Sequence, residues 1–344
     1  MGIKNLTKLI RQFAPNAIQQ QDISTYAGKR VAVDANLFVY KFLHGPDAHP
    51  SRALYGFLDL ERWFRKFDIR AVYVFDGRKL EAKKPEIERR YYKRKRLVSR
   101  AQECRSELKQ LEEGAPSAAS ASAPAPSPAA PPAPKRSAGP PRSAMRVKLE
   151  LAALEQQIVH VTPQQISDCQ QLLRLAGIPV VIAEHEAEAT CATLNRMGCV
   201  DAVVSEDMDS LCFGCPVLLR DCRPFKRTLT EIRLLDLLKE LKLTAHQFVD
   251  LCILCGCDFA STLRCLSYEQ AYPAILEYRS IEVLLQHVSP PPNTFTYRDA
   301  RAIFLNPPPI SAETAANCLA GDRVRPRQVD DFLRRKVGWY RGHR

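Results

Sequence analysis

Short apolar runs alternate with amphipathic stretches along most of the chain. The apolar runs are rich in β-branched residues, which indicates buried strands, and they lie at residues 30–33, 71–75, 179–183, 201–205 and 217–219. Helical spacing of apolar positions occurs at residues 36–43, 51–67, 162–176, 191–197 and 246–254. Strands that alternate with helices in this way are typical of an α/β fold with a mostly parallel sheet.

One long segment departs from this pattern. Residues 115–144 hold 26 alanines, prolines and serines in 30 positions. A segment of that composition cannot bury enough surface to fold, so we predict a disordered insert. The chain then divides into an N-terminal region (1–114), the insert (115–144), an internal region (145–265) and a C-terminal helical region with a basic tail (266–344).

Acidic residues recur at the ends of the predicted elements. The members of this set are Asp34, Asp76, Glu186, Glu188, Asp207, Asp209 and Asp258. Because the carboxyl ends of parallel strands meet at one sheet edge, we expect these side chains to converge there. Oxygen ligands suit hard divalent cations, so the set predicts a site for Mg²⁺ or Mn²⁺. A single acid at a helix start is more often a cap or a dipole partner, but that explanation weakens when seven acids share the placement.

The charge balance points to a polyanionic partner. The formal net charge is +12, with 50 lysines and arginines against 38 acids. A generic basic surface is the alternative. Residues 78–105 hold twelve basic residues and four acids, which is often only a solvated helix face. Because this run follows Asp76, we expect Lys83 and Arg90 to neutralise phosphate charge, with a helix that begins at Pro85 and leaves Lys83 in the preceding turn.

The acids and the basic segment together fit the hydrolysis of phosphodiesters, and the motifs of several other enzyme classes are absent from the sequence. Two divalent cations about 4 Å apart can activate water and stabilise the leaving oxygen in a displacement at phosphorus. Carboxylates beside a basic segment therefore predict phosphodiester hydrolysis. The chain has no GxGxxG after a strand, no GxxxxGK[ST] loop, no HExxH helix and no GxSxG.

The twelve cysteines are expected to be reduced. Most lie in apolar stretches, where a free thiol behaves as a small hydrophobe. The pairs Cys212/Cys215 and Cys252/Cys255 lie inside apolar elements and not on turn-rich knuckles, so we do not predict zinc. No apolar run approaches the length of a membrane span and basic residues interrupt the N-terminus, so we expect no signal peptide and no membrane contact.

In these motifs the chain resembles the flap endonucleases of the XPG structure-specific nuclease family. The matching stretches follow the family order over residues 1–100 and 150–260, and they are MGIKNLTKLI, VAVDANLFVYKFL, VYVFDGRKLEAKK, LLRLAGIPVVIAEHEAEATCATL, SEDMDSLCFGCPVLLR and FVDLCILCGCDF. The resemblance implies a three-layer α/β/α core, a helical arch over the active site, and cleavage of 5′ DNA flaps with two Mg²⁺ ions.

The resemblance also implies roles for individual residues. The metal ligands would be Asp34, Asp76, Glu186, Glu188, Asp207, Asp209 and Asp258. Lys83 and Arg90 match arch residues that approach the scissile phosphate, and Tyr40 matches an aromatic that stacks beside it. Gly2 would become the first residue after methionine removal, at the entry to the site.

Three departures from the family pattern matter. Residues 264–268 (RCLSY) replace a glycine-rich hairpin that contacts duplex and helps to bind potassium, and without glycines a backbone approaches phosphate less easily. The insert at 115–144 interrupts the arch and leaves open whether the arch threads or clamps a strand. Residues 328–333 lack the spacing of a sliding-clamp peptide, so we do not predict clamp binding.

We therefore predict a Mg²⁺-dependent 5′-flap endonuclease with 5′-exonuclease activity, a nuclear monomer that acts on flapped or nicked DNA in replication or repair. The altered segment at 264–268 keeps open an RNA-cleaving nuclease of the same fold, as virus-encoded host-shutoff nucleases are, which would be cytoplasmic. A non-catalytic nucleic-acid scaffold is the third possibility, and the complete set of seven acids argues against it.

Overall fold

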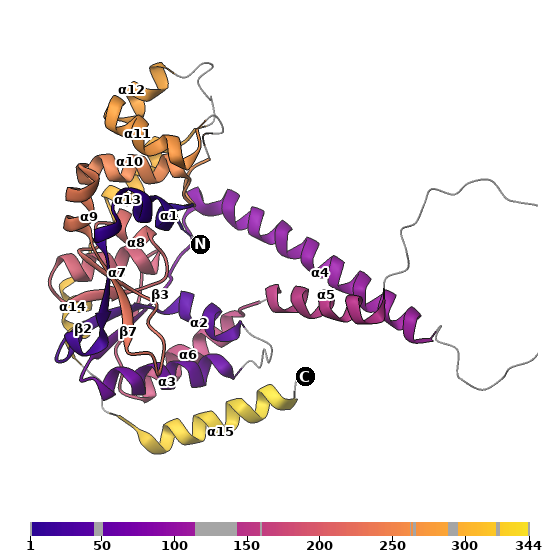
Figure 1. Ribbon diagram of the computed structural model, residues 1–344. Helices are drawn as coiled ribbons and strands as arrows, with labels where there is room; N and C mark the ends of the chain where they lie inside the picture. The colour runs from indigo at the N-terminus through magenta and orange to yellow at the C-terminus, as the bar shows by residue number, and fades with distance from the viewer. Residues whose placement is uncertain are drawn as a thin grey trace, which may run out of the picture. The chain divides into compact units, whose positions relative to one another are not determined.

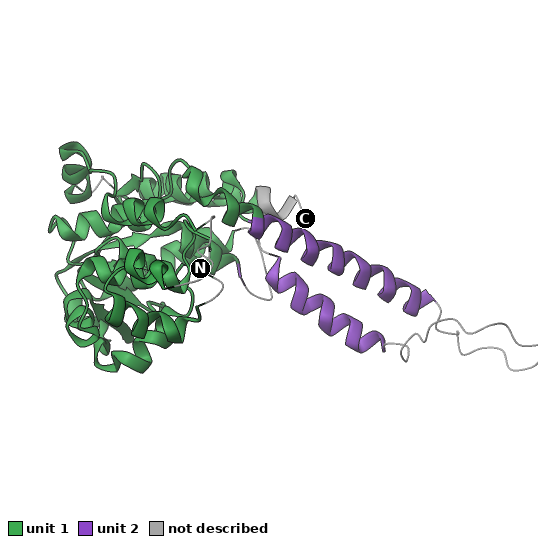
Figure 2. Cartoon of the chain, turned by 90° about the horizontal axis from the view of Figure 1, so that it is seen from above, with its two compact units in different colours: residues 1–43, 49–88, 161–344 green, residues 44–48, 89–160 purple. Residues whose placement is uncertain are grey.

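The structure is a computed structural model that describes residues 2–44, 51–113, 143–158, 160–261, 263, 266–287, 295–320 and 324–342. Two compact units are present, one of residues 1–43, 49–88 and 161–344 and the other of residues 44–48 and 89–160 (Figure 2). Almost all of the predicted insert lies outside the described residues.

In the described part of the chain, the first unit is built on a mixed sheet of seven strands. In chain order the strands are β1 (Ile18–Asp22), β2 (Arg30–Asp34), β3 (Arg70–Phe75), β4 (Val180–Ile182), β5 (Ala202–Val204), β6 (Val217–Arg220) and β7 (Thr228–Arg233). Their order across the sheet is β1-β7-β6-β5-β2-β3-β4. The five predicted strands are confirmed as β2 to β6, and all four pairings among them are parallel. β1 and β7, which pair antiparallel to each other, were not predicted.

Helices of the first unit connect and cover these strands (Figure 1). The helices of the N-terminal half of the chain are α1 (Leu6–Phe13), α2 (Ala35–Leu43), α3 (Arg52–Lys66), α4 (Lys84–Glu113), α5 (Ala144–Gln157) and α6 (Pro163–Leu175), with short 3-10 helices at Pro15–Ala17, Ile23–Tyr26 and Glu81–Lys83. Of these, α5 and most of α4 belong to the second unit. The others are α7 (Ala187–Arg196), α8 (Asp209–Cys212), α9 (Leu234–Leu241), α10 (Ala245–Cys255), α11 (Tyr268–Tyr278), α12 (Ile281–Gln286), α13 (Tyr297–Leu305), α14 (Ala312–Leu319) and α15 (Pro326–Gly342). A capping box of Thr162 and Gln165 opens α6.

Helices cover both faces of the sheet. Alternate residues of a strand point to opposite faces, so each strand can pack against helices on both sides. On one face, Val72 and Val74 of β3 pack into the core that contains α7. On the other face, Phe57 of α3 lies with its ring centroid 5.4 Å from Tyr73 of β3 and 5.2 Å from Phe42 of α2. These contacts confirm a three-layer α/β/α arrangement.

Successive strands are added on opposite sides of β2, so the strand order reverses there. β3 pairs with one side of β2, whereas β5 pairs with the other, in the register Val33 to Val204. In open α/β sheets ligands bind outside the carboxyl ends of strands at such a switch point. The residues that follow β2 and β5 therefore define the place to look for a site.

The C-terminal helix α15 packs on the first unit through α6. Phe332 is buried, and Lys336 Nζ lies 2.7 Å from Asp168 Oδ1 of α6. At least one basic residue of the tail is therefore held in an internal ion pair.

In the second unit, α5 runs antiparallel to the distal part of α4. Ala101, Cys104 and Val147 are buried between them. Ion pairs link the two helices, and they are Arg100–Glu150 at 2.9 Å, Arg105–Glu155 at 2.7 Å and Lys148–Glu112 at 3.0 Å. α5 begins at Ala144, inside the segment assigned to the insert, because Ser143 caps it.

Candidate metal centre

The first carboxylate of the site stands at the end of β2. Asp34 is 2 % exposed, and it accepts a hydrogen bond of 2.9 Å from Ser205 Oγ, the residue that follows β5. A second bond of 3.4 Å comes from the backbone N–H of Leu37 at the start of α2. The register of β2 and β5 thus places Asp34 directly at the switch point.

Asp76 follows the neighbouring strand β3. Its two oxygens accept from Asn36 Nδ2 at 2.5 Å and from the backbone N–H of Ala187 at 2.9 Å. The next residue, Gly77, lies so close to the segment before α7 that a Cβ there would meet the carbonyl oxygen of Ala183 at 1.9 Å. Glycine at this position lets the end of β3 and the start of α7 meet.

Glu186 and Glu188 come from the first turn of α7. Glu186 is the N-cap residue and Glu188 lies within the helix, which begins at Ala187, four residues before the predicted start at Cys191. One oxygen each of Asp76, Glu186 and Glu188 lie within 4.8 Å of one another. We call these three residues the α7 group. The positive end of the helix dipole partly offsets their mutual repulsion.

Asp207 and Asp209 follow β5, and we call them the β5 group. Both are 4 % exposed, and the backbone N–H of Asp209 donates to Asp207 Oδ1 at 3.1 Å. Gly2 lies against them, since a Cβ on Gly2 would be 1.8 Å from Asp207 Oδ1 and 2.6 Å from Asp209 Oδ1. Gly2 also has φ 78°, a left-handed conformation that favours glycine.

Lys83 connects the α7 group to Asp258. Its Nζ donates to Glu186 Oε2, and it lies 3.8 Å from Asp258 Oδ2, beyond the end of α10. Burial works against the ammonium charge, but the carboxylates of Glu188, Glu186 and Asp258 outweigh it and raise the pKa of Lys83. Lys83 is therefore a fixed cation at the acidic cluster.

Burial and mutual repulsion raise the pKa values of Asp34, Glu188 and Asp209 above their usual range. Burial, followed by the charges of Asp76 and Asp207, raises the pKa of Asp34 to about 8. Burial raises the pKa of Glu188 well above its usual range, with Asp34 and Asp207 adding to the effect. For Asp209, burial and then the charges of Asp207 and Asp258 also raise the pKa well above its usual range.

The donor set fits divalent cations. All of the convergent ligands are oxygens, the type that hard cations prefer. Two buried oxygens, Asp209 Oδ1 and Asn36 Oδ1, have no hydrogen-bond partner among the described residues. An unsatisfied buried acceptor costs free energy that a cation or its water would recover. These orphaned oxygens support a cation site more directly than the number of acids does.

The structure brings all seven predicted acids into one cluster, in which short distances, ion pairs with Lys83 and charge interactions link the carboxylates. Lys83 lies in it, and it precedes α4, which begins at Lys84 and not at Pro85 as predicted. Tyr40 lies on α2 with its side chain 40 % exposed. Arg90 lies on α4 in the second unit, so its role stays a prediction.

Two residues of the site were not predicted from the sequence. Asn36 and Ser205 hydrogen-bond to Asp76 and Asp34, respectively. Their polar side chains directly beside strand ends were the available signal, but their partners depend on which strands pair. Nearby acids outside the seven have other contacts, since Asp201 pairs with Lys29 at 3.3 Å and Glu206 with Lys41 at 2.7 Å.

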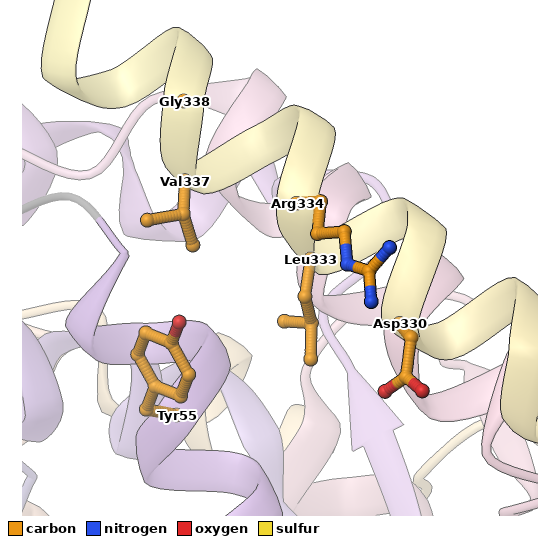
Figure 3. Close-up of a pocket in the computed structure, with 6 residues that line it drawn as sticks. All are labelled: Tyr55, Asp330, Leu333, Arg334, Val337 and Gly338. Carbon is orange, nitrogen blue, oxygen red and sulfur yellow. The ribbon is translucent and has the colours of Figure 1, made fainter.

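A separate hollow lies between α15 and α3 (Figure 3). It has a volume of about 510 Å³ and is lined by Tyr55, Asp330, Leu333, Arg334, Val337 and Gly338. None of these residues belongs to the acidic cluster.

Among the described residues, no helix is both long and apolar enough to cross a membrane.

Comparisons with known proteins agree with this site. The XPG N-terminal domain family matches residues 1–97, and the XPG I-region family matches residues 177–258. The two matched segments contain all seven acids of the cluster.

Curated relatives match most of the chain. Flap endonuclease 1-A of Sorghum bicolor is 34% identical over 325 residues, which cover 89% of this chain and 76% of that protein. Flap endonuclease 1 of Xiphophorus maculatus is 31% identical over 334 residues, which cover 91% of this chain and 77% of that protein.

Solved structures share the fold. The catalytic core of Rad2 in complex with DNA substrate superposes with a TM-score of 0.65 at 19% identity and covers 98% of this chain and 96% of that chain. Flap endonuclease-1 from Methanococcus jannaschii superposes with a TM-score of 0.57 at 20% identity and covers 97% of this chain and 99% of that chain.

Proposed function

Because the chain belongs to the XPG family of structure-specific nucleases, among the flap endonucleases, we propose that it cleaves 5′ flaps in DNA and has 5′-exonuclease activity. The observation that carries the proposal is the convergence of carboxylates from several elements on one sheet edge, with Lys83 fixed among them.

We assign the seven acids as ligands for two Mg²⁺ ions, which Mn²⁺ can replace. Bound there, such ions supply charge neutralisation and water activation for an in-line displacement at phosphorus. The protein's own contribution is to hold the oxygens in place. Ser205 and Leu37 orient Asp34, while Asn36 and the N–H of Ala187 orient Asp76.

Lys83 and Arg90 are the candidates for binding the scissile phosphate. Lys83 Nζ donates to Glu186, and its ammonium would be available to a phosphate oxygen if this carboxylate instead held a metal ion. A fixed ammonium that stabilises charge in the transition state accelerates the reaction. Arg90 would add a second positive charge from α4.

Tyr40 and Gly2 would position the substrate. Tyr40 is exposed on α2, the helix that follows Asp34, where its ring can stack beside a nucleotide. Gly2 packs against the β5 group and leaves no room for a side chain there. Substrate entry beside Gly2 therefore depends on the absence of a Cβ.

We further propose that the protein is a nuclear monomer that acts on flapped or nicked DNA and does not bind a sliding clamp through residues 328–333. We propose that the chain is divided into four regions, with boundaries at residues 114, 144 and 265. In the segment at 264–268, residues 264 and 265 lie outside the described residues, and Ser267 caps α11.

The test is a cleavage assay on matched substrates. Flapped DNA, nicked duplex and single-stranded RNA of the same sequence are incubated with the protein in Mg²⁺ and in EDTA. We expect Mg²⁺-dependent cutting of the flap and slower cutting at the nick. Preference for RNA would favour the RNA-cleaving alternative, and no cleavage of any substrate would favour a scaffold.

A further inference from the structure

The loop that joins β6 to β7 has an unusual turn at its tip. The backbone N–H of Lys226 donates to the carbonyl oxygen of Arg223 at 3.1 Å, which closes a turn of four residues. Pro224 occupies the second position, and Phe225 occupies the third with φ 71°. This is the pattern of a type II turn, in which the third position usually belongs to glycine because φ is positive.

Phe225 combines this strain with almost complete exposure. Its side chain is 91 % exposed, the largest value among the large apolar side chains of the described residues. The other non-glycine residues with positive φ in the described part of the chain are Asn5, Asp68, Asp221, Lys242 and Arg279. All of those are polar or charged. A strained turn that presents an exposed aromatic ring is a candidate contact for a binding partner.

Charged neighbours indicate the chemistry of that partner. Arg223 Nε lies 2.6 Å from Asp221 Oδ1, and Lys226 Nζ pairs with the same carboxylate. Two cations therefore share one acid, which leaves a net positive charge beside the ring. An aromatic ring between cations suits single-stranded nucleic acid, which offers bases for stacking and phosphates for the cations.

The base of the loop lies at the metal-binding edge of the sheet. The backbone N–H of Asp221 donates to Glu206 Oε1 at 3.1 Å, and Glu206 directly precedes Asp207 of the β5 group. Lys41, which follows Tyr40 on α2, donates to the same Glu206 oxygen at 2.7 Å. The loop thus starts beside the residues that we assign to metal and substrate.

We propose that residues 221–227 form a second nucleic-acid contact, in which Phe225 stacks on an unpaired base while Arg223 and Lys226 bind the flanking phosphates. The proposal rests on the proposed nuclease function for its choice of nucleic acid. It concerns binding and not the chemistry of cleavage.

The decisive variant is Phe225→Gly, because glycine adopts φ 71° without strain and the turn is kept. Binding of flapped DNA is measured by fluorescence anisotropy in Ca²⁺. We expect about tenfold weaker binding, as for the loss of one stacked base. Phe225→Trp should bind as tightly as the unchanged protein. Leu235→Ala removes another exposed apolar side chain and should leave the affinity unchanged.

Stacking has its own signature in 2-aminopurine fluorescence. When this base is placed at successive positions along the flap, one position should show a fluorescence change on binding that Phe225→Gly abolishes. Arg223→Gln or Lys226→Gln should lower the slope of log affinity against log salt by about one. Unchanged affinity and fluorescence in Phe225→Gly, or an equal loss in Leu235→Ala, would overturn the proposal.

The cleavage assay separates this inference from the function on which it rests. Flap cleavage with no effect of Phe225→Gly on binding removes the loop contact alone. Binding that depends on Phe225 in a protein that cleaves no substrate removes the proposed nuclease activity alone.

Discussion

The α7 group and the β5 group hold their carboxylates in different ways. In the α7 group, Glu186 already has a cation, since Lys83 Nζ donates to it. In the β5 group, Asp209 Oδ1 has no hydrogen-bond partner among the described residues, and Gly2 packs against both acids. A metal ion at the α7 group must compete with Lys83, whereas one at the β5 group satisfies an orphaned oxygen. The α7 group is therefore partly balanced within the fold, whereas the β5 group retains a buried oxygen that a bound cation would satisfy.

Removing the β5 charge should have the largest effect. Asp209→Asn keeps the side-chain shape but loses an anionic ligand, so flap cleavage should fall by about a thousandfold. Mg²⁺ should raise the melting temperature of the unchanged protein by more than that of the variant, which keeps one ion, because each bound ion stabilises the folded state. Glu184→Gln is the matched control, since this side chain is 63% exposed and should not affect either measurement.

Lys83→Ala tests the balance of the α7 group. Cleavage should fall by about a hundredfold because the phosphate loses a fixed cation. Flapped DNA should still bind, and Mg²⁺ should stabilise the variant at lower concentrations because Lys83 no longer competes for Glu186. Unchanged cleavage would remove Lys83 from the chemistry, and weaker Mg²⁺ binding would contradict the competition.

Gly2→Ala tests the packing against the β5 group. A Cβ placed 1.8 Å from Asp207 Oδ1 must displace the N-terminal segment or the carboxylate, and small displacements in an active site are costly. We expect cleavage to fall by about tenfold. Gly198→Ala is the control, because Gly198 has a similar φ of 72° but no atom within 4 Å of the added Cβ. An equal loss in both variants would show that backbone strain alone is responsible.

The smallest effect concerns stability without metal. Asp34 has a pKa of about 8 in the fold against 3.8 for an ordinary aspartate, so between these values the folded state holds a proton that the unfolded state has lost. Stability should therefore fall as the pH rises through this window. Asp34→Asn should remove the contribution of Asp34 to that fall, leave those of Glu188 and Asp209, and raise the free energy of unfolding at pH 8 by about 1 kcal/mol. Urea titrations in EDTA check this, and a destabilised variant would contradict it.

The sequence predicted the parallel core and the acids better than the edge of the sheet. β2 and β3 are continuous apolar runs, each followed by an acid, which is what a buried parallel strand requires. β1 carries three consecutive glutamines and has no apolar alternation. β7 has Glu231 at a fully buried position, where Tyr26 and Arg233 bind it, and this acid hides the apolar pattern.

The supporting residues of the site were beyond prediction for a related reason. Ser205 reaches Asp34 only because β5 pairs with β2 in one register, and no local pattern specifies that pairing. Phe225 had a signal, since the order Arg-Pro-Phe-Lys suggests a turn. Its positive φ and its exposure become evident only in three dimensions.

The most direct test of the metal centre is a titration with Mn²⁺, followed by electron paramagnetic resonance. We predict two bound ions per chain in the unchanged protein, with the spin coupling expected of ions about 4 Å apart. Asp209→Asn should lose one ion and the coupling, while Glu184→Gln should keep both. A chain that binds no Mn²⁺, or an Asp209→Asn variant that binds the same number of ions as the unchanged protein, would contradict the assignment of the acidic cluster as a metal centre.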